Sequence, residues 1–93
     1  MDTFVILRRS AWKEESDLQD AAEDSTRVAD EEMPGQVRWI RSYVLEEEDG
    51  TLGTVCIYQA EDADTLVEHA QRAGLPADEI LKVADTVIIR DDP

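Results

Sequence analysis

The sequence is poor in the residues that build disulfides and soft-metal sites. It contains one cysteine, Cys56, and one histidine, His69. A single cysteine cannot form a disulfide within the chain, which agrees with a reducing compartment. No apolar run approaches the roughly 18 residues that a membrane-spanning helix needs, and the chain does not open on the basic-then-apolar pattern of a signal peptide. A cytoplasmic location is therefore expected.

Basic residues are also scarce. The 93 residues include 23 acidic and 9 basic ones, giving a net charge of -14. Nucleic-acid binding needs a concentrated basic face, and an anionic membrane surface repels a chain of this charge, so neither partner is expected. Adaptation to concentrated cytoplasmic salt is a second explanation of the acidity, because salt screens the mutual repulsion of carboxylates. Such a protein is halophilic and loses structure in dilute buffer.

Two runs rich in β-branched and aromatic residues stand in the middle of the chain. Val37 to Leu45 and Thr54 to Ala60 predict the two strands of a hairpin, joined by an acidic segment with two glycines. The apolar run Thr3 to Arg9 predicts a first strand that lies inside the sheet, because it is apolar at consecutive positions. Val83 to Ile89 predicts the last strand, after a turn with a helical kink over residues 75–80.

The first helix is predicted between the first two strands. Ser16 and Gln19 have the spacing of a capping box, which predicts a helix that begins near Asp17. An earlier start, capped by Ser10, is the alternative. A thin stripe of mostly small apolar residues continues to Met33, and the Pro-Gly pair at residues 34–35 ends the helix.

The second helix follows the hairpin. Asp62 is the predicted N-cap of a helix over Ala63 to Ala73, and Gly74 is its C-terminal stop. The predicted order is therefore βαββαβ. With right-handed crossovers this order gives a ferredoxin-like α+β fold, in which a four-stranded antiparallel sheet carries two helices on one face. Residues 1–93 are expected to form this single domain, whose small core would gain from association with a second copy.

The uncovered face of the sheet is the expected dimer surface. Strict alternation along the second strand gives two sets of side chains, namely Val37, Trp39, Arg41, Tyr43 and Leu45 on one face and Arg38, Ile40, Ser42 and Val44 on the other. Both sets contain apolar groups, whereas two helices on one side cover only one of them. The other is left for a second protomer or a ligand.

Trp39, Arg41 and Tyr43, with Tyr58 on the neighbouring strand, are the candidate ligand-binding or dimer residues. Alternate side chains on one strand lie about 7 Å apart, a spacing that could grip a planar or anionic ligand. Trp, Tyr and Arg are also enriched as anchors of protein interfaces, and a dimer interface is the preferred interpretation.

His69 and Cys56 are the candidate metal ligands, because imidazole and thiolate groups bind soft divalent metals. A closed structural zinc site takes four ligands, so carboxylates or a symmetry mate would have to complete the site. A buried thiol and a surface histidine are the simpler interpretations of these two residues. No nucleophile motif or phosphate loop accompanies them, so no catalytic residue is assigned.

Three segments, Trp39 to Val44, Thr54 to Ala60 and Glu68 to Ile80, resemble the DUF4242 family, and the Gly-Leu-Pro-Ala-Asp sequence at residues 74–78 is the most specific part. That family comprises short ferredoxin-like proteins and includes a nickel-responsive, nickel-binding member. The resemblance implies a homodimer and Ni²⁺ as the ligand. One position departs from the family, where a histidine often stands at the place of Arg41; arginine cannot coordinate a metal because it does not deprotonate.

The favoured interpretation is a small, non-enzymatic homodimer that binds nickel or another divalent transition metal. An enzyme of the dimeric α/β-barrel type, acting on a small organic substrate, is the alternative, with Tyr58, Arg41, Cys56 and His69 as its acid–base candidates. A regulatory module that binds a partner protein is a third. A walled cavity beside Trp39 would favour the enzyme, and a closed, dry dimer interface would favour the regulatory module.

Overall fold

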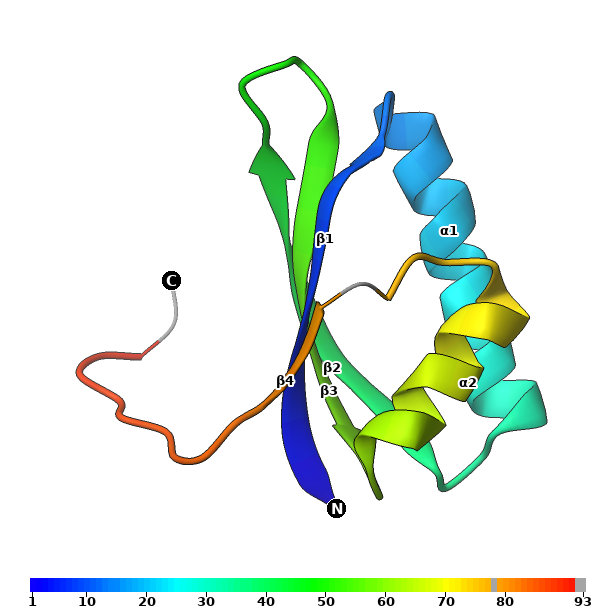
Figure 1. Ribbon diagram of the computed structural model, residues 1–93, viewed down its shortest axis with the longest axis vertical. Helices are drawn as coiled ribbons and strands as arrows, with labels where there is room; N and C mark the ends of the chain where they lie inside the picture. The colour runs from blue at the N-terminus through cyan, green and yellow to red at the C-terminus, as the bar shows by residue number, and fades with distance from the viewer. Residues whose placement is uncertain (78, 92–93) are drawn as a thin grey trace.

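A computed structural model describes residues 1–77 and 79–91 of the chain. Its elements in chain order are β1 (Asp2–Trp12), α1 (Glu15–Arg27), the π-helical turn η1 (Val28–Glu32), β2 (Val37–Glu46), β3 (Leu52–Ala60), α2 (Ala63–Ala73) and β4 (Glu79–Lys82). The strands form a four-stranded antiparallel sheet in the order β2-β3-β1-β4, and both helices lie on the same side of it (Figure 1). This is the ferredoxin-like α+β fold that the sequence predicted, with β1 inside the sheet.

A β-bulge in β2 overturns the predicted alternation. Trp39 pairs with Tyr58 of β3, and Arg41 pairs with the very next residue along β3, Ile57. Ile40 is therefore an extra residue with no partner across the ladder. Residues after the bulge face the side opposite to the one that strict alternation predicts. Trp39 and Arg41, predicted to share a face, lie on opposite faces of the sheet.

The pairing register defines two faces, because directly paired residues project to the same side. The inner face, toward the helices, carries Phe4, Ile6, Arg8, Val37, Trp39, Ser42, Val44, Thr54, Cys56, Tyr58 and Ile80. The outer face carries Val5, Leu7, Arg41, Tyr43, Val55, Ile57 and Leu81, with Ile40 beside them. The core lies between the inner face and the helices, where the rings of Trp39 and Tyr58 stack with centroids 5.8 Å apart.

Helix α1 begins earlier than predicted. Its N-cap is Glu14, whose side chain makes no capping hydrogen bond, so the predicted cap at Ser16 is wrong. Strand β1 continues to Trp12, past the predicted end at Arg9, and the short connection that remains enters the helix before Ser16 is reached. The helix ends in the π-turn, where the Met33 amide donates to the carbonyl of Val28 over 3.0 Å.

Helix α2 agrees with the prediction at both ends. The Asp62 side chain accepts a hydrogen bond from the Thr65 amide over 2.8 Å, as an N-cap does. Gly74 ends the helix with φ 70°, in the left-handed region that favours glycine.

The last strand is not where the sequence predicted it. Strand β4 is Glu79–Lys82, which falls on the predicted turn, whose residue Asp78 lies outside the described residues. The run predicted as a strand, Val83 to Ile89, continues the ladder only through the bond from the Val83 amide to the Thr3 carbonyl, at 2.9 Å. It then leaves the sheet on the outer side (Figure 1), since a β-branched run forms a strand only where a neighbouring strand can pair with it.

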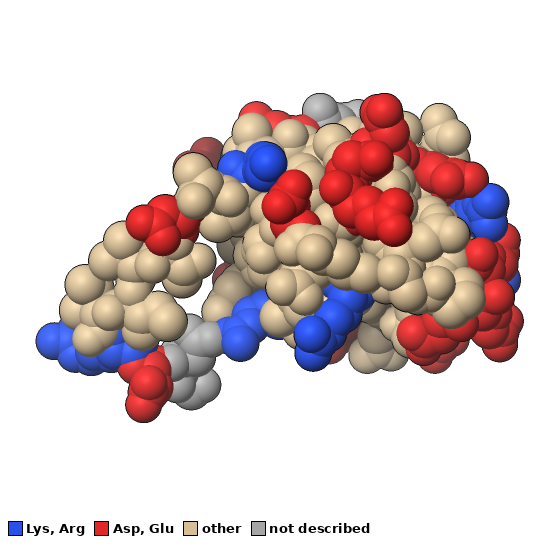
Figure 2. Space-filling view, turned by 90° about the horizontal axis from the view of Figure 1, so that it is seen from below, with Lys and Arg blue, Asp and Glu red and all other residues tan. Residues whose placement is uncertain are grey.

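The surface is dominated by carboxylates. The space-filling view shows Asp and Glu side chains in several groups, with only a few Lys and Arg among them (Figure 2). The ion pairs of the described residues use surface groups, for example Arg27 with Glu32 and Arg72 with Glu68. Within the part of the chain that the structure describes, no helix is long and apolar enough to cross a membrane.

Candidate functional site

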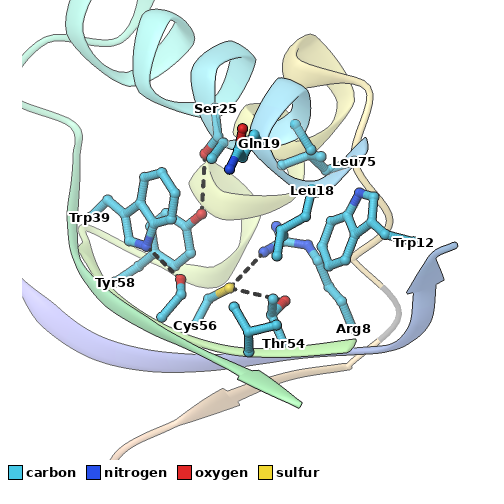
Figure 3. A pocket seen from close by; sticks show the side chains of 14 residues that line it. Arg8, Trp12, Leu18, Gln19, Ser25, Trp39, Thr54, Cys56, Tyr58 and Leu75 are labelled. Atoms are coloured by element: carbon cyan, nitrogen blue, oxygen red, sulfur yellow. Dashed lines mark hydrogen bonds between the residues drawn. The ribbon is translucent and has the colours of Figure 1, made fainter. Parts of the chain in front are cut away.

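A cavity of about 220 Å³ lies between the inner face of the sheet and helix α1 (Figure 3). Its walls are almost wholly apolar and include Trp12 of β1, Leu18 of α1, Trp39 of β2 and Leu75 after α2. The bulge contributes to this lining, because it turns Ser42 and Val44 to the same side as Trp39. Trp39 Nε1 donates to Ser42 Oγ over 2.8 Å, which fixes the indole ring against the wall.

The small residues of α1 leave this space open. Ala21, Ala22 and Ser25 face the cavity from the helix; the two alanines present only a methyl group each, and Ser25 Oγ lies 3.2 Å from the Tyr58 hydroxyl. Gln19 and Val44 are exposed at its rim. A thin apolar stripe on α1 was visible in the sequence, and in the folded chain it produces a cavity.

Among the described residues that line this cavity, Arg8 is the charged one. Its side chain projects from β1 into the interior, and the residue is 2% exposed. Nε donates to the carbonyl of Pro76 at 2.6 Å, Nη1 donates to Cys56 Sγ at 3.2 Å, and the guanidinium carbon lies 5.9 Å from the centroid of the Tyr58 ring. Nη2 has no hydrogen-bond partner among residues 1–77 and 79–91. Arginine stays charged in proteins, so the cavity holds a positive charge.

Sequence reasoning missed Arg8, although a signal was present. Phe4, Ile6 and Arg8 alternate along a strand that was predicted to lie inside the sheet. Alternation with two apolar residues on an interior strand places an arginine on the buried face.

Cys56 is buried, as the simpler interpretation of this residue predicted. Its sulfur accepts the hydrogen bond from Arg8 Nη1 and donates to Thr54 Oγ1 at 3.3 Å. The group nearest to the thiol is thus a cation, which opposes the approach of a metal ion to the sulfur.

His69 lies in the interior and not on the surface. The residue is 0% exposed, and its Nε2 lies 3.0 Å from the backbone carbonyl of Ser25. A carbonyl only accepts, so Nε2 carries the proton and Nδ1 has the lone pair. Burial is the main cause that lowers the pKa of His69, and the charge of Arg8 lowers it further. Burial likewise raises the pKa of Tyr58, whose hydroxyl lies 3.2 Å from Ser25 Oγ.

The residues around His69 and Cys56 do not fit a resident nickel ion. Within the described ranges, no group of three or more His, Cys, Asp or Glu side chains is arranged so that it could hold a metal ion. The lone pair on His69 Nδ1 has the electronic form that a metal ligand needs, but it is enclosed in the core and has the charge of Arg8 nearby.

The four residues predicted to form one ligand or dimer face are divided between two sides. Trp39 and Tyr58 belong to the core and line the cavity. Arg41 and Tyr43 project from the outer face, where Arg41 Nη1 donates to Tyr43 Oη at 3.3 Å. The bulge at Ile40 is the physical reason for the division.

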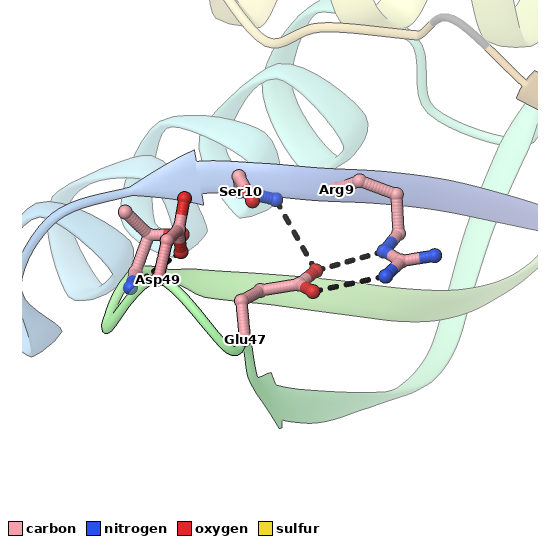
Figure 4. Close-up of polar contacts among 5 residues, drawn as sticks. Arg9, Ser10, Glu47 and Asp49 are labelled. Atoms are coloured by element: carbon pink, nitrogen blue, oxygen red, sulfur yellow. Dashed lines mark hydrogen bonds and ion pairs between the residues drawn. The ribbon is translucent and has the colours of Figure 1, made fainter.

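A second polar cluster, at the tip of the β2–β3 hairpin, has a structural role (Figure 4). Arg9 of β1 donates two hydrogen bonds to Glu47, at 2.8 and 3.0 Å, and the Ser10 amide donates a third at 3.3 Å. The bond from Arg9 lowers the pKa of Glu47. Gly53 lies directly beneath, and a Cβ atom there would come within 2.7 Å of the Arg8 carbonyl oxygen. The cluster fastens the hairpin to β1.

Comparison with known proteins gives one family and one fold relative. A family model described as "Nickel responsive protein SCO4226-like" matches residues 4–83. The crystal structure of SCO4226 from Streptomyces coelicolor A3(2) is similar, with a TM-score of 0.71 and 20% sequence identity over 91% of this chain and 99% of that chain. At this identity the likeness shows the fold alone. No curated protein matches the chain.

Proposed function

The chain belongs to the SCO4226-like family of nickel-responsive proteins, and from this premise we propose that it is a non-catalytic binding protein that works as a homodimer. The dimer forms through the outer face of the sheet. The observation that carries the proposal is that both helices cover the inner face, so no helix formed by the described residues lies on the outer face (Figure 1).

Apolar groups on and beside the outer face support this assembly. Ile40, Tyr43 and Leu81 are 40%, 47% and 50% exposed. The C-terminal segment, residues 83–91, borders a hollow beside this face. It exposes a run of apolar side chains, namely Val87, Ile88 and Ile89 at 79%, 75% and 78%. A second copy related by a two-fold axis would bury both surfaces, and a small domain gains stability from that burial.

The chemistry of the cavity supports binding over catalysis. The walled cavity beside Trp39 is the feature that favours the enzyme alternative. An acid–base mechanism, however, needs a group that exchanges a proton near neutral pH. Arg8 keeps its proton, burial raises the pKa of Tyr58 above its ordinary value of 10.0, and the Nε2 proton of His69 is held by the Ser25 carbonyl.

We propose a role for nickel because the matching family is described as nickel responsive. Because the residues around His69 and Cys56 do not fit the ion, we assign any nickel that this protein binds to groups from two copies of the chain. An isologous contact places the same donor group from each of the two copies at the interface, so two carboxylates from each chain supply four metal ligands. Asp85 and Asp91 border the hollow at the outer face and are the nearest candidates for this role.

The dimer is tested by sedimentation equilibrium in molar salt, with Tyr43→Arg as the variant. Val67→Arg is the matched control, because Val67 is an exposed apolar residue on α2, 38% accessible, and the charge change is the same. We expect a dimeric wild type, a control that is equally dimeric, and a Tyr43→Arg variant whose dissociation constant rises about tenfold or more. A monomeric wild type, or equal weakening by both substitutions, would contradict the assembly.

A further inference from the structure

The cavity beside Arg8 contains a buried positive charge with no negative partner among the described residues. From this we propose that the cavity is a binding site for a small organic carboxylate, held by Arg8 at its charged end and by apolar walls along its body. The site is separate from any nickel site and from the outer face of the sheet.

The charge is the first part of the argument. Arg9, Arg27, Arg72 and Lys82 form ion pairs with carboxylates, and their side chains are 69%, 49%, 40% and 63% exposed. Arg8 is 2% exposed and has a carbonyl, a thiol and an aromatic ring as its neighbours. Buried charges are costly unless they are paired, and arginine cannot avoid the cost by losing its proton. An anion that enters the cavity would remove this cost.

The geometry of the guanidinium defines how many donors the ligand meets. Nε and Nη1 are already engaged with Pro76 and Cys56, so the side chain is held in place. Nη2 remains without a partner in the described parts of the chain, and Arg8 lines the cavity (Figure 3). One free amino group of one arginine suits a carboxylate. A phosphate, with three or more oxygens, needs several donors, whereas the hydroxyl groups of Ser25, Ser42 and Thr54 in this lining are already engaged with neighbouring side chains.

The walls define the body of the ligand. The Trp39 and Tyr58 rings stack nearly parallel, with an interplanar angle of 12°, and present a flat surface. An apolar cavity of about 150 Å³ accepts benzene, so one of about 220 Å³ has room for a six-membered ring with a carboxylate attached. A planar monocarboxylate of this size is the ligand class that the cavity selects.

Benzoate is the probe that we would use for this class. The chain has two tryptophans, Trp12 and Trp39, and both line the cavity, so intrinsic fluorescence reports on its contents directly. We expect a saturable change in tryptophan emission with benzoate in the folded wild type. Benzyl alcohol has the ring without the charge, and inorganic phosphate has the charge without the ring. Each should bind at least about tenfold more weakly than benzoate. No saturable change with benzoate, or equal binding of benzyl alcohol, would overturn the proposal.

Three variants separate the site from a general effect of charge. Arg8→Met removes the anchor, and Arg9→Met is the matched control, because it removes the same charge from the adjacent residue, which is on the surface. We expect Arg8→Met to weaken benzoate binding about tenfold and Arg9→Met to leave it unchanged; equal effects would reject a specific role for Arg8.

Ala22→Leu fills the cavity without touching Arg8 and should also remove binding. If circular dichroism shows that Arg8→Met is unfolded, Ala22→Leu tests the binding site in its place. An unchanged benzoate affinity in folded Ala22→Leu would refute the assignment of the ligand to this cavity.

Discussion

Arg8 and His69 lie in the same interior in opposite states of charge. Arginine keeps its proton when buried, whereas burial lowers the pKa of histidine and leaves it neutral. The two effects are linked, because the positive charge of Arg8 is one of the causes that lower the pKa of His69. A single residue on β1 therefore provides the charge of the cavity and adds to the effect of burial, which is the main cause of the lowered pKa of His69.

His69 should make the stability of the fold depend on pH. In the unfolded chain its imidazole takes up a proton near about pH 6.5, while the folded chain has a lower pKa. With respect to His69, the free energy of unfolding therefore has its full value above about pH 6.5. It decreases as the pH falls from there through the lower pKa of the folded state. We expect the free energy of unfolding in urea to fall more between about pH 7 and about pH 5 for the wild type than for His69→Gln. Parallel pH profiles of the two proteins would contradict this account.

Residue patterns predicted some side-chain environments and missed others. The burial of Cys56 followed from its place in a β-branched strand. The burial of His69 did not follow, because it lies on the flank of the apolar stripe of α2 and is enclosed by Ser25, which belongs to the other helix. A single-helix pattern contains no information about a hydrogen-bond partner contributed by another element.

At the scale of elements, the bulge at Ile40 is the feature with the largest consequences. It separates Trp39 from Arg41 and adds Ser42 and Val44 to the wall of the cavity. The sequence has no glycine or proline there to mark it, so alternation was extended through it. Helix α2 could be predicted at both ends because its caps are local, whereas β4 could not, since its position depends on pairing with β1.

Deleting Ile40 tests this description of β2. The deletion removes the extra residue, so every other side chain of the strand keeps its present face and cooperative unfolding should be retained. Deletion of Ser42 is the matched control, because it shortens the strand equally but moves Arg41 to the inner face as an unpaired buried charge. In urea unfolding we expect the control to be less stable than the Ile40 deletion by about 3 kcal/mol or more. Equal stability of the two would show that the register is not as described.

For the whole molecule, the dominant property is a net charge of -14 on 93 residues. Carboxylates crowd the surface (Figure 2), and their repulsion opposes the compact state in dilute buffer. We expect the melting temperature to rise by at least about 4 °C between millimolar and molar potassium chloride, the shift that about 1 kcal/mol produces in a domain of this size. Differential scanning calorimetry measures it, and a melting temperature independent of salt would count against a stabilising role for screening.

Our two proposals concern opposite faces of the sheet. The inner face and α1 enclose the cavity, and the outer face is the surface to which we assign the second copy. The family description names its proteins as nickel responsive, and our proposal assigns any bound nickel to the assembled pair and not to the interior of one chain.

The most direct test is native mass spectrometry of the chelator-stripped protein with nickel in concentrated volatile salt, for the wild type and His69→Ala, with magnesium as the control for loosely held cations. The account predicts a dimeric mass that carries nickel in a fixed stoichiometry, not reproduced by magnesium, with the same stoichiometry in His69→Ala. Nickel on the monomeric mass that disappears in His69→Ala would contradict it, and would locate the metal at the buried histidine instead.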